Sequence, residues 1–281
     1  MSDQLMTAAV QMDGIIPEVW AQAFYPTLLE ALPFNDVVSR DYEGDIAALG
    51  DTVNINSIPQ FGVAEDFAED QKVDAEALTV SKQQLVVNHQ LGKDFIITEK
   101  ALKQSLPAQN VLRDLAFHAI MKKMQLILIG DTVPSASAPD HQIPYTSGTT
   151  LALADILAAK ELLDTANVPD AGQRCMILGA AQWNDIFNIA GFTSRDFIPA
   201  GSPLSSGALP TPILGFLPKM TTEAGNVAYL FDPMYMSLAV QKQIGVKVFD
   251  LGVTGVRAQR VNVDVLFGDK QLSNVRVVTI S

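Results

Sequence analysis

Histidines, cysteines and clustered carboxylates, the side chains that most often carry out chemistry, are few in this chain and widely spaced. Its histidines, His89, His118 and His141, have no second ligand at the spacing of a zinc site. The single Cys175 precedes an apolar run without any signature of a catalytic thiol, as expected for a small buried side chain. Phosphate-binding glycine patterns and the Gly-x-Ser-x-Gly motif are absent from the sequence. We therefore predict no catalytic, cofactor or metal site, and no enzymatic activity.

One dense group of carboxylates lies between residues 63 and 77, where Lys72 is the only basic residue. The spacing lacks the central Gly and terminal Glu of a calcium loop. We interpret the segment as solvated or facing a partner, with cation binding as the alternative. The acidic residues are Glu65, Asp66, Glu69, Asp70, Asp74 and Glu76.

Two runs rich in β-branched residues flank this acidic segment, at 49–59 and 78–88. Their order predicts a long hairpin arm over residues 42–97 with the acidic segment at its tip. A polar tip does not fit in a core, and an isolated hairpin is only marginally stable in water. We therefore expect this arm to contact another subunit.

Residues 1–35 form a second predicted arm. Three prolines, Pro17, Pro26 and Pro33, prevent one long helix across the segment. Its large apolar side chains must be buried against the body of the chain or against a neighbour. Trp20, Phe24 and Tyr25 are the candidate contact residues.

The rest of the chain predicts interleaved helices and strands. The strongest helix starts near Ser105 and ends at Gly130, mostly buried, with a narrow stripe that we expect to be solvated. Helix, strand and helix follow at 151–166, 174–178 and 181–189, then a long loop at 191–218 and four strands up to residue 280. The stripe consists of Asp114, His118, Lys122 and Gln125.

Composition describes an ordinary globular protein. Its 281 residues are 48% hydrophobic and 18% charged, with a formal net charge of −12. That charge disfavours non-specific binding to DNA phosphates but is compatible with a container that touches nucleic acid weakly. The start of the sequence lacks the features of a signal peptide, and no apolar run approaches the ~20 residues of a membrane span. We expect synthesis in the cytoplasm and no membrane partner.

Several short motifs, in their order along the chain, resemble the major capsid proteins of tailed bacteriophages with the Hong Kong 97-like fold. The front third carries Asp41-Tyr42-Glu43-Gly44, then Gly50-Asp51-Thr52-Val53-Asn54-Ile55, then Leu78-Thr79-Val80-Ser81-Lys82-Gln83-Gln84-Leu85. Further on, Asn167-Val168-Pro169 followed by Arg174-Cys175-Met176-Ile177-Leu178 is similar to the helix-to-strand step of that family, and Ile213-Leu214-Gly215-Phe216 is similar to the strand after its variable loop.

The resemblance implies an α+β capsid fold in four parts. These are an N-terminal arm (1–35), an extended β-hairpin loop (42–97), a peripheral domain with a long spine helix (98–150 and 236–281), and an axial domain (151–235). It also implies a structural protein of the virion that self-assembles into pentamers and hexamers of an icosahedral shell around double-stranded DNA, in the host cytoplasm. Portal, scaffold or decoration proteins are the implied partners. For the contacts between subunits we expect the acidic tip (Glu65, Asp66, Glu69 and Asp70) to meet Arg257 and Arg260.

Two alternatives stay open from the sequence. An encapsulin-like shell has a similar fold but encloses protein cargo. A soluble α/β enzyme would use the acidic hairpin as a lid and the loop at 191–218 as a border of its site.

Overall fold

The computed structural model describes residues 29–46, 50–64, 66, 76–100, 106–170, 172–189, 192, 212–251 and 257–281, without the side chains of 106–110. Six predicted contact residues lie outside this part of the chain: Trp20, Phe24, Tyr25, Glu65, Glu69 and Asp70.

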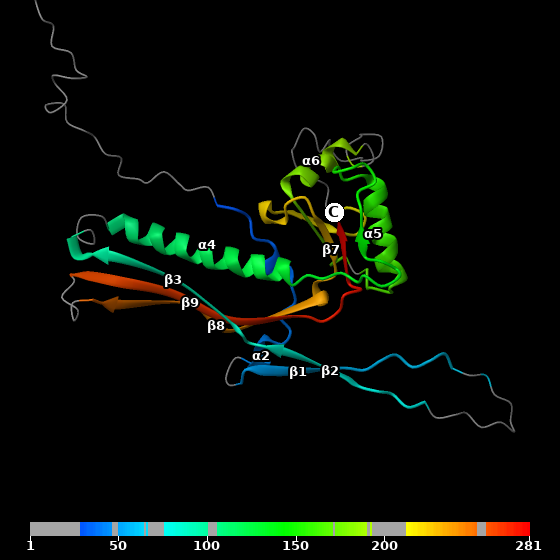
Figure 1. Ribbon diagram of the computed structural model, residues 1–281, viewed down its shortest axis with the longest axis horizontal. Coiled ribbons are helices and arrows are strands. Elements are labelled where there is room, and N and C mark those ends of the chain that lie inside the picture. The colour runs from blue at the N-terminus through cyan, green and yellow to red at the C-terminus, as the bar shows by residue number, and fades with distance from the viewer. Residues whose placement is uncertain are drawn as a thin grey trace, which may run out of the picture.

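The described elements alternate between helix and strand (Figure 1). The helices are α1 (Phe34–Val37), α2 (Glu43–Ile46), α4 (Leu106–Gly130), α5 (Leu153–Thr165) and α6 (Ala180–Asn188), with 3-10 turns η1 (Thr222–Ala224) and η2 (Pro233–Tyr235). The strands are β1 (Thr52–Ser57), β2 (Ser81–Val86), β3 (His89–Thr98), β4 (Gln142–Ile143), β5 (Cys175–Leu178), β6 (Leu217–Met220), β7 (Ala228–Phe231), β8 (Met236–Asp250), β9 (Ala258–Gln271) and β10 (Val277–Ile280).

A long antiparallel sheet, in the order β3-β9-β8, carries α4 along one face (Figure 1). The register of β3 on β9 runs from His89 opposite Phe267 to Thr98 opposite Ala258. Alternating Val263, Val265 and Phe267 are buried in the core cluster that includes α4, as the period of a half-buried strand requires. The strands predicted at the end of the chain are confirmed.

A second sheet, in the order β4-β10-β7-β5-β6, has α5 packed against β10 and α6 against β5. The side chains of β5, β7 and β10 are buried on both faces, which explains their continuous apolar sequences. The predicted helix at 151–166 is confirmed as α5, and its predicted apolar face, including Ile156, Ala159 and Leu163, is buried.

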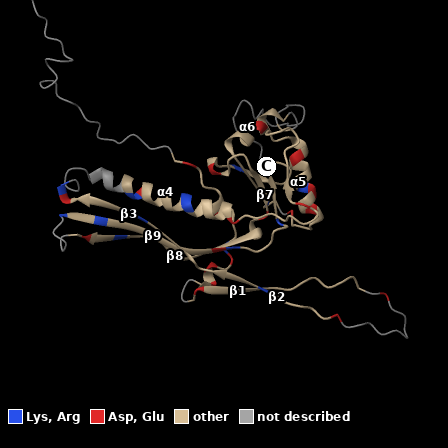
Figure 2. Cartoon of the chain, in the orientation of Figure 1, with Lys and Arg blue, Asp and Glu red and all other residues tan. Residues whose placement is uncertain are grey.

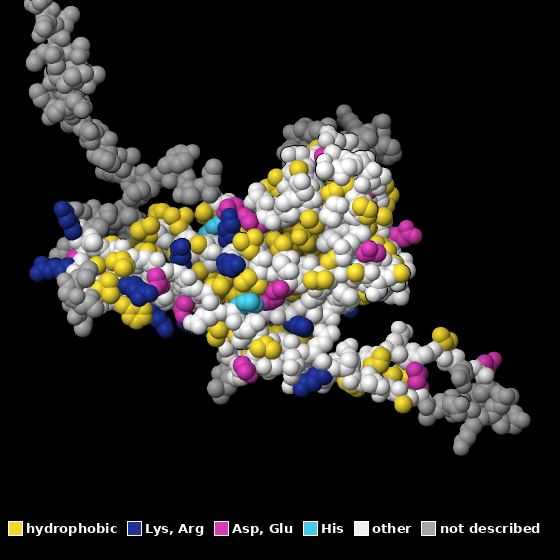
Figure 3. Space-filling model, viewed as in Figure 1, with side chains coloured by type: hydrophobic (Ala, Val, Ile, Leu, Met, Phe, Trp, Pro, Cys, Tyr) yellow, Lys and Arg dark blue, Asp and Glu magenta, His cyan; other side chains and the backbone are white. Residues whose placement is uncertain are grey.

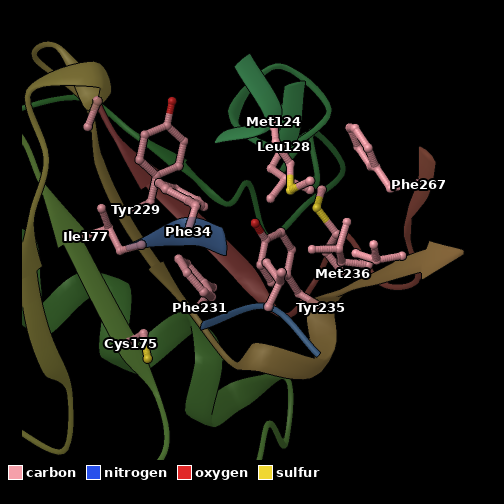
Figure 4. Close-up of a cluster of buried hydrophobic side chains, with 14 of the residues drawn as sticks. Phe34, Met124, Leu128, Cys175, Ile177, Tyr229, Phe231, Tyr235, Met236 and Phe267 are labelled. Atoms are coloured by element: carbon pink, nitrogen blue, oxygen red, sulfur yellow. The ribbon is translucent and has the colours of Figure 1, made fainter. Parts of the chain in front are cut away.

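The core joins the two sheets around Phe34, whose side chain is fully buried (Figure 4). Its ring lies 5.4 Å from the ring of Tyr229 and 5.6 Å from that of Phe231, between centroids. Phe231 in turn contacts Tyr235 at 4.6 Å. The described end of the predicted N-terminal arm is therefore packed on its own body.

The predicted hairpin is present as the antiparallel pair β1 and β2, from Thr52 opposite Val86 to Ser57 opposite Ser81. It leaves the body beside β8 and β9 and extends away from it (Figure 1). Residues 89–98, which we placed in the same arm, form β3 and pair with β9. The sequence alone did not separate them because both segments alternate like strands.

The predicted solvated stripe on α4 is wrong in its second half. Gln125 is fully buried, and Lys122 and His118 contact Glu30. The stripe is covered because the segment before α1 lies across it, and a single helix sequence does not reveal which segment will do so.

Candidate assembly surfaces

The base of the hairpin is held to the body by backbone and amide groups. Gln241 donates from Nε2 to the carbonyl oxygen of Gly50 at 2.7 Å, and Gln83 donates to that of Leu272 at 3.1 Å. Leu85, with no exposed surface, packs with Ile46 of α2 and Ala239 of β8. The direction in which the hairpin leaves the body is therefore fixed at its base.

Gly268 allows the hairpin to approach β9 closely. A Cβ atom on Gly268 would lie 2.3 Å from the carbonyl oxygen of Val86 and 2.8 Å from the Cα of Val87. Real Cβ atoms are not found at such distances from backbone, so only glycine fits under this part of β2.

Beyond its base the hairpin exposes large apolar side chains. Ile58, Phe61 and Val63 are 68%, 64% and 97% exposed. Figure 3 shows hydrophobic side chains on the hairpin, separate from the body. Adjacent apolar groups on a projecting element mark a site of interaction with another protein more often than a solvated surface.

A second apolar group lies at the free end of the three-stranded sheet, at the opposite side of the molecule from the hairpin (Figure 3). Ile96 and Phe249 are 62% and 50% exposed and flank Arg260, which is paired in register with both. Figure 2 shows Lys and Arg residues gathered at this end, with Asp and Glu residues among them. The surface therefore combines apolar area with positive charge.

Among the predicted contact residues, Asp66, Arg257 and Arg260 lie in the described part. Arg257 is exposed just before β9. Arg260 donates from Nε to Asp94 Oδ2 at 2.8 Å, so its charge is partly balanced within its own chain. A hydrogen bond from Arg260 and a smaller contribution from a hydrogen bond of Asn262 hold the pKa of Asp94 below its usual value. Asp66 is exposed on the hairpin, far along the chain from both arginines.

Residues 30–34 are attached to α4 by a polar network. Lys122 Nζ donates to Glu30 Oε1 at 2.6 Å and lies 3.0 Å from Glu223 Oε1. The hydrogen bond from Lys122 holds the pKa of Glu30 below its usual value, and hydrogen bonds to Glu30 and Glu223 raise the pKa of Lys122. Buried Gln125 accepts from the Phe34 backbone N–H at 3.3 Å and donates to Thr221 at 3.0 Å.

The hollow beside the hairpin gives no support to the alternative of an enzyme. A hollow of about 780 Å³ beside the hairpin is lined by Lys82, Gln83, Gln84, Val86, Lys270 and Gln271. This lining has no nucleophile next to a base. Cys175 is buried in β5, as predicted, and burial raises the pKa of its thiol, which makes it a poor nucleophile. None of the helices in the described ranges has both the length and the apolar character that crossing a membrane requires.

Sequence reasoning missed one cluster of potential metal ligands. His89 at the start of β3, Asp131 just after α4 and Asp269 in β9 bring one ligand atom each within 4.8 Å of the others. They are the only such group among the residues that the structure describes. Their long separation in sequence leaves no spacing motif, and only the pairing of β3 with β9 brings two of them together.

Comparison with known proteins bears on the fold and the class of the protein. Residues 129–220 match a family described as phage capsid protein. Comparison with curated proteins gives no match. Among solved structures, a chain of Mycobacterium phage Che8 aligns over 95% of this chain and 97% of its own length, with a TM-score of 0.75 and 21% identity. The chain has the fold of a phage capsid protein.

Two cyanophage structures agree with this result. A chain of the Cyanophage P-SCSP1u capsid aligns over 100% of this chain and 96% of its own, with a TM-score of 0.77 and 10% identity. A chain of the Cyanophage Pam1 capsid asymmetric unit covers 100% and 98%, with a TM-score of 0.74 and 16% identity. The predicted α+β capsid fold and the resemblance to tailed-phage major capsid proteins are confirmed. Family match and fold together support a major capsid structural protein.

Proposed function

We propose that this protein is the major capsid protein of a tailed phage, many copies of which form the pentamers and hexamers of an icosahedral shell around double-stranded DNA. The observation that carries the proposal is the projecting hairpin, rigid at its base and apolar beyond it. No described residue of the same chain covers Val63, which is 97% exposed. A second copy of the chain would bury this surface, which is unfavourable to leave in water.

The parts of the subunit follow the division expected from the sequence: an arm (1–35), an extended loop (42–97), a peripheral domain (98–150 and 236–281) and an axial domain (151–235). The pairing of the strands supports two adjustments to these boundaries. β3 pairs with β9 and so goes with the peripheral sheet. β4 and β10 share a sheet with β5 and β7 and so go with the axial domain.

Contacts between subunits would be head to tail, the hairpin of one copy on the sheet end of the next. The hairpin and the end that carries Ile96, Phe249 and Arg260 lie on opposite sides of one subunit (Figures 1 and 3). Such heterologous contacts close into rings when the rotation permits. The acidic tip, from Glu65 to Asp70, would approach Arg257 and Arg260 of the neighbour. Trp20, Phe24 and Tyr25 of the arm would add apolar contacts.

The shell would belong to the virion, be made in the host cytoplasm and act without enzymatic activity. The net charge of −12 favours weak contact with the packaged DNA over tight binding. Portal, scaffold and decoration proteins would complete the particle.

Electron microscopy of the purified full chain tests the proposal. We expect rings or closed shells. A uniform population of monomers under all conditions of salt and concentration would contradict it. Particles isolated from a host that contain protein cargo instead of DNA would favour the encapsulin-like alternative.

The double variant Phe61→Ser and Val63→Ser tests the observation on which the proposal rests. Both side chains are exposed in the single chain, so its melting temperature should hardly change, since surface substitutions usually alter stability by less than about 0.5 kcal/mol. Assembly should require a higher protein concentration. Assembly at an unchanged protein concentration would show that these side chains of the hairpin do not contribute to the contact between subunits.

A further inference from the structure

His89, Asp131 and Asp269 meet where the hairpin returns to the body. His89 begins β3 just after the hairpin, Asp131 directly follows α4, and Asp269 lies next to Gly268, on which the hairpin base rests. His89 Nε2 lies 3.4 Å from Asp269 Oδ1. Two ligands of a tetrahedral zinc ion, each about 2.0 to 2.1 Å from the metal, would lie about 3.3 Å apart. The existing separation therefore fits two ligands of one ion.

The Asp269 carboxylate supplies an independent indication of a ligand. Its side chain is only 4% exposed, and its Oδ1 atom is buried without a hydrogen-bond partner. A buried carboxylate oxygen without a donor is costly, because it loses its bonds to water and gains none. This oxygen points towards His89, whose ring is held by stacking on Phe267 at 5.2 Å between centroids.

The charge around the cluster favours a cation. The carboxylates of Asp131 and Asp269 each bring an oxygen within 4.8 Å of the other and of a ring nitrogen of His89. Asp131 also follows the last turn of α4, where the helix dipole is negative and a carboxylate is unfavourable. Two carboxylates and the C-terminal end of a helix thus meet at one point beside His89.

The cluster is accessible from solvent. A hollow of about 320 Å³ is lined by Asn88, His89, Asp131, Asp269, Lys270 and Gln271. An ion could enter with water, and Asp131 is exposed to it.

We propose that His89, Asp131 and Asp269 bind one divalent transition-metal ion of the zinc class, with water as the remaining ligand. One imidazole and two carboxylates suit zinc better than calcium, which prefers six to eight oxygen ligands. The ion would join β3, β9 and the end of α4, and so stabilise the body beside the hairpin base. This inference does not depend on the capsid function.

Calorimetric titration of the EDTA-treated full chain with ZnCl₂ tests the proposal. We expect one zinc ion per chain and a higher melting temperature. His89→Gln and Asp131→Asn change accessible side chains and should each weaken the affinity for zinc at least ~10-fold. Mutating residues that only hydrogen-bond to metal ligands already lowers metal affinity by about 10-fold or more, so replacing a ligand should cost no less. His118→Gln is the matched control, because His118 also lies near a carboxylate, that of Glu30 at 3.8 Å, outside the cluster.

Several outcomes would overturn the site: no zinc binding to the wild-type chain, undiminished binding by both cluster variants, or equal loss in His118→Gln. If the cluster variants do not fold, X-ray absorption at the zinc edge of the loaded wild-type chain decides. We expect nitrogen and oxygen ligands at about 2.0 to 2.2 Å, including imidazole. A sulfur ligand at about 2.3 Å would assign the ion to Cys175 and contradict the proposal.

Discussion

Gly268→Ala should separate the hairpin from the body of the subunit. The added methyl group would lie 2.3 Å from the carbonyl oxygen of Val86 and 2.8 Å from the Cα of Val87. Both are backbone atoms, so no side-chain rotation relieves the contact. Either β9 or the base of the hairpin must move.

The expected cost follows from what such a movement disturbs. Overpacking a well-packed site usually costs about 1 to 3 kcal/mol. If the hairpin lifts away instead, Leu85, which is fully buried against Ile46 and Ala239, becomes exposed, at a cost of about 1.5 to 3 kcal/mol. Because the two responses are alternatives, we expect a loss of about 2 to 3 kcal/mol in the free energy of unfolding, not their sum.

Thermal and denaturant unfolding measure the loss, and electron microscopy measures the yield of assembled particles. Gly245→Ala is the matched control, because it makes the same change in the neighbouring strand β8, where the nearest atoms to the new Cβ lie at an ordinary 3.8 Å. The argument fails if the two alanine variants are equally stable and assemble equally well.

Three further predictions concern groups inside the subunit. Arg174→Met should cost about 1 to 3 kcal/mol in chemical unfolding, because the buried guanidinium donates to Asp164 and to the carbonyl oxygens of Val168 and Pro169, which lose their donor. Lys160→Met removes a partly buried partner of Asp164 and Asp170 and should cost no more than about 1 kcal/mol. Equal costs would contradict the role of burial. Tyr235→Phe removes the 2.9 Å hydrogen bond to Thr132 and should lower stability by about 0.5 to 1.5 kcal/mol, whereas a more stable variant would refute the contribution of this bond. Glu30→Gln should lower the melting temperature at pH 7, because it removes the ion pair with Lys122. The pKa of Glu30 is held below its usual value of about 4.3, so the difference in melting temperature between wild type and variant should vanish on acidification below that lowered pKa. A difference that does not depend on pH would rule out this ion pair as its cause.

The sequence by itself determined most elements and the class of the fold. Continuous apolar runs gave β5 and β7, alternation gave β9, and the buried face of α5 followed from Ile156, Ala159 and Leu163. These patterns are local, because each element must bury one face, or both, away from water. The short motifs, taken in order, then gave the capsid fold.

Only the tertiary structure decided which elements meet. It paired residues 89–98 with β9 instead of the hairpin, and it covered Gln125 with the segment before Phe34. It also brought His89, Asp131 and Asp269 together and placed Gly268 under Val86. These contacts join residues far apart in the chain, and their energies depend on distances of a few ångströms that no local pattern of residue types encodes.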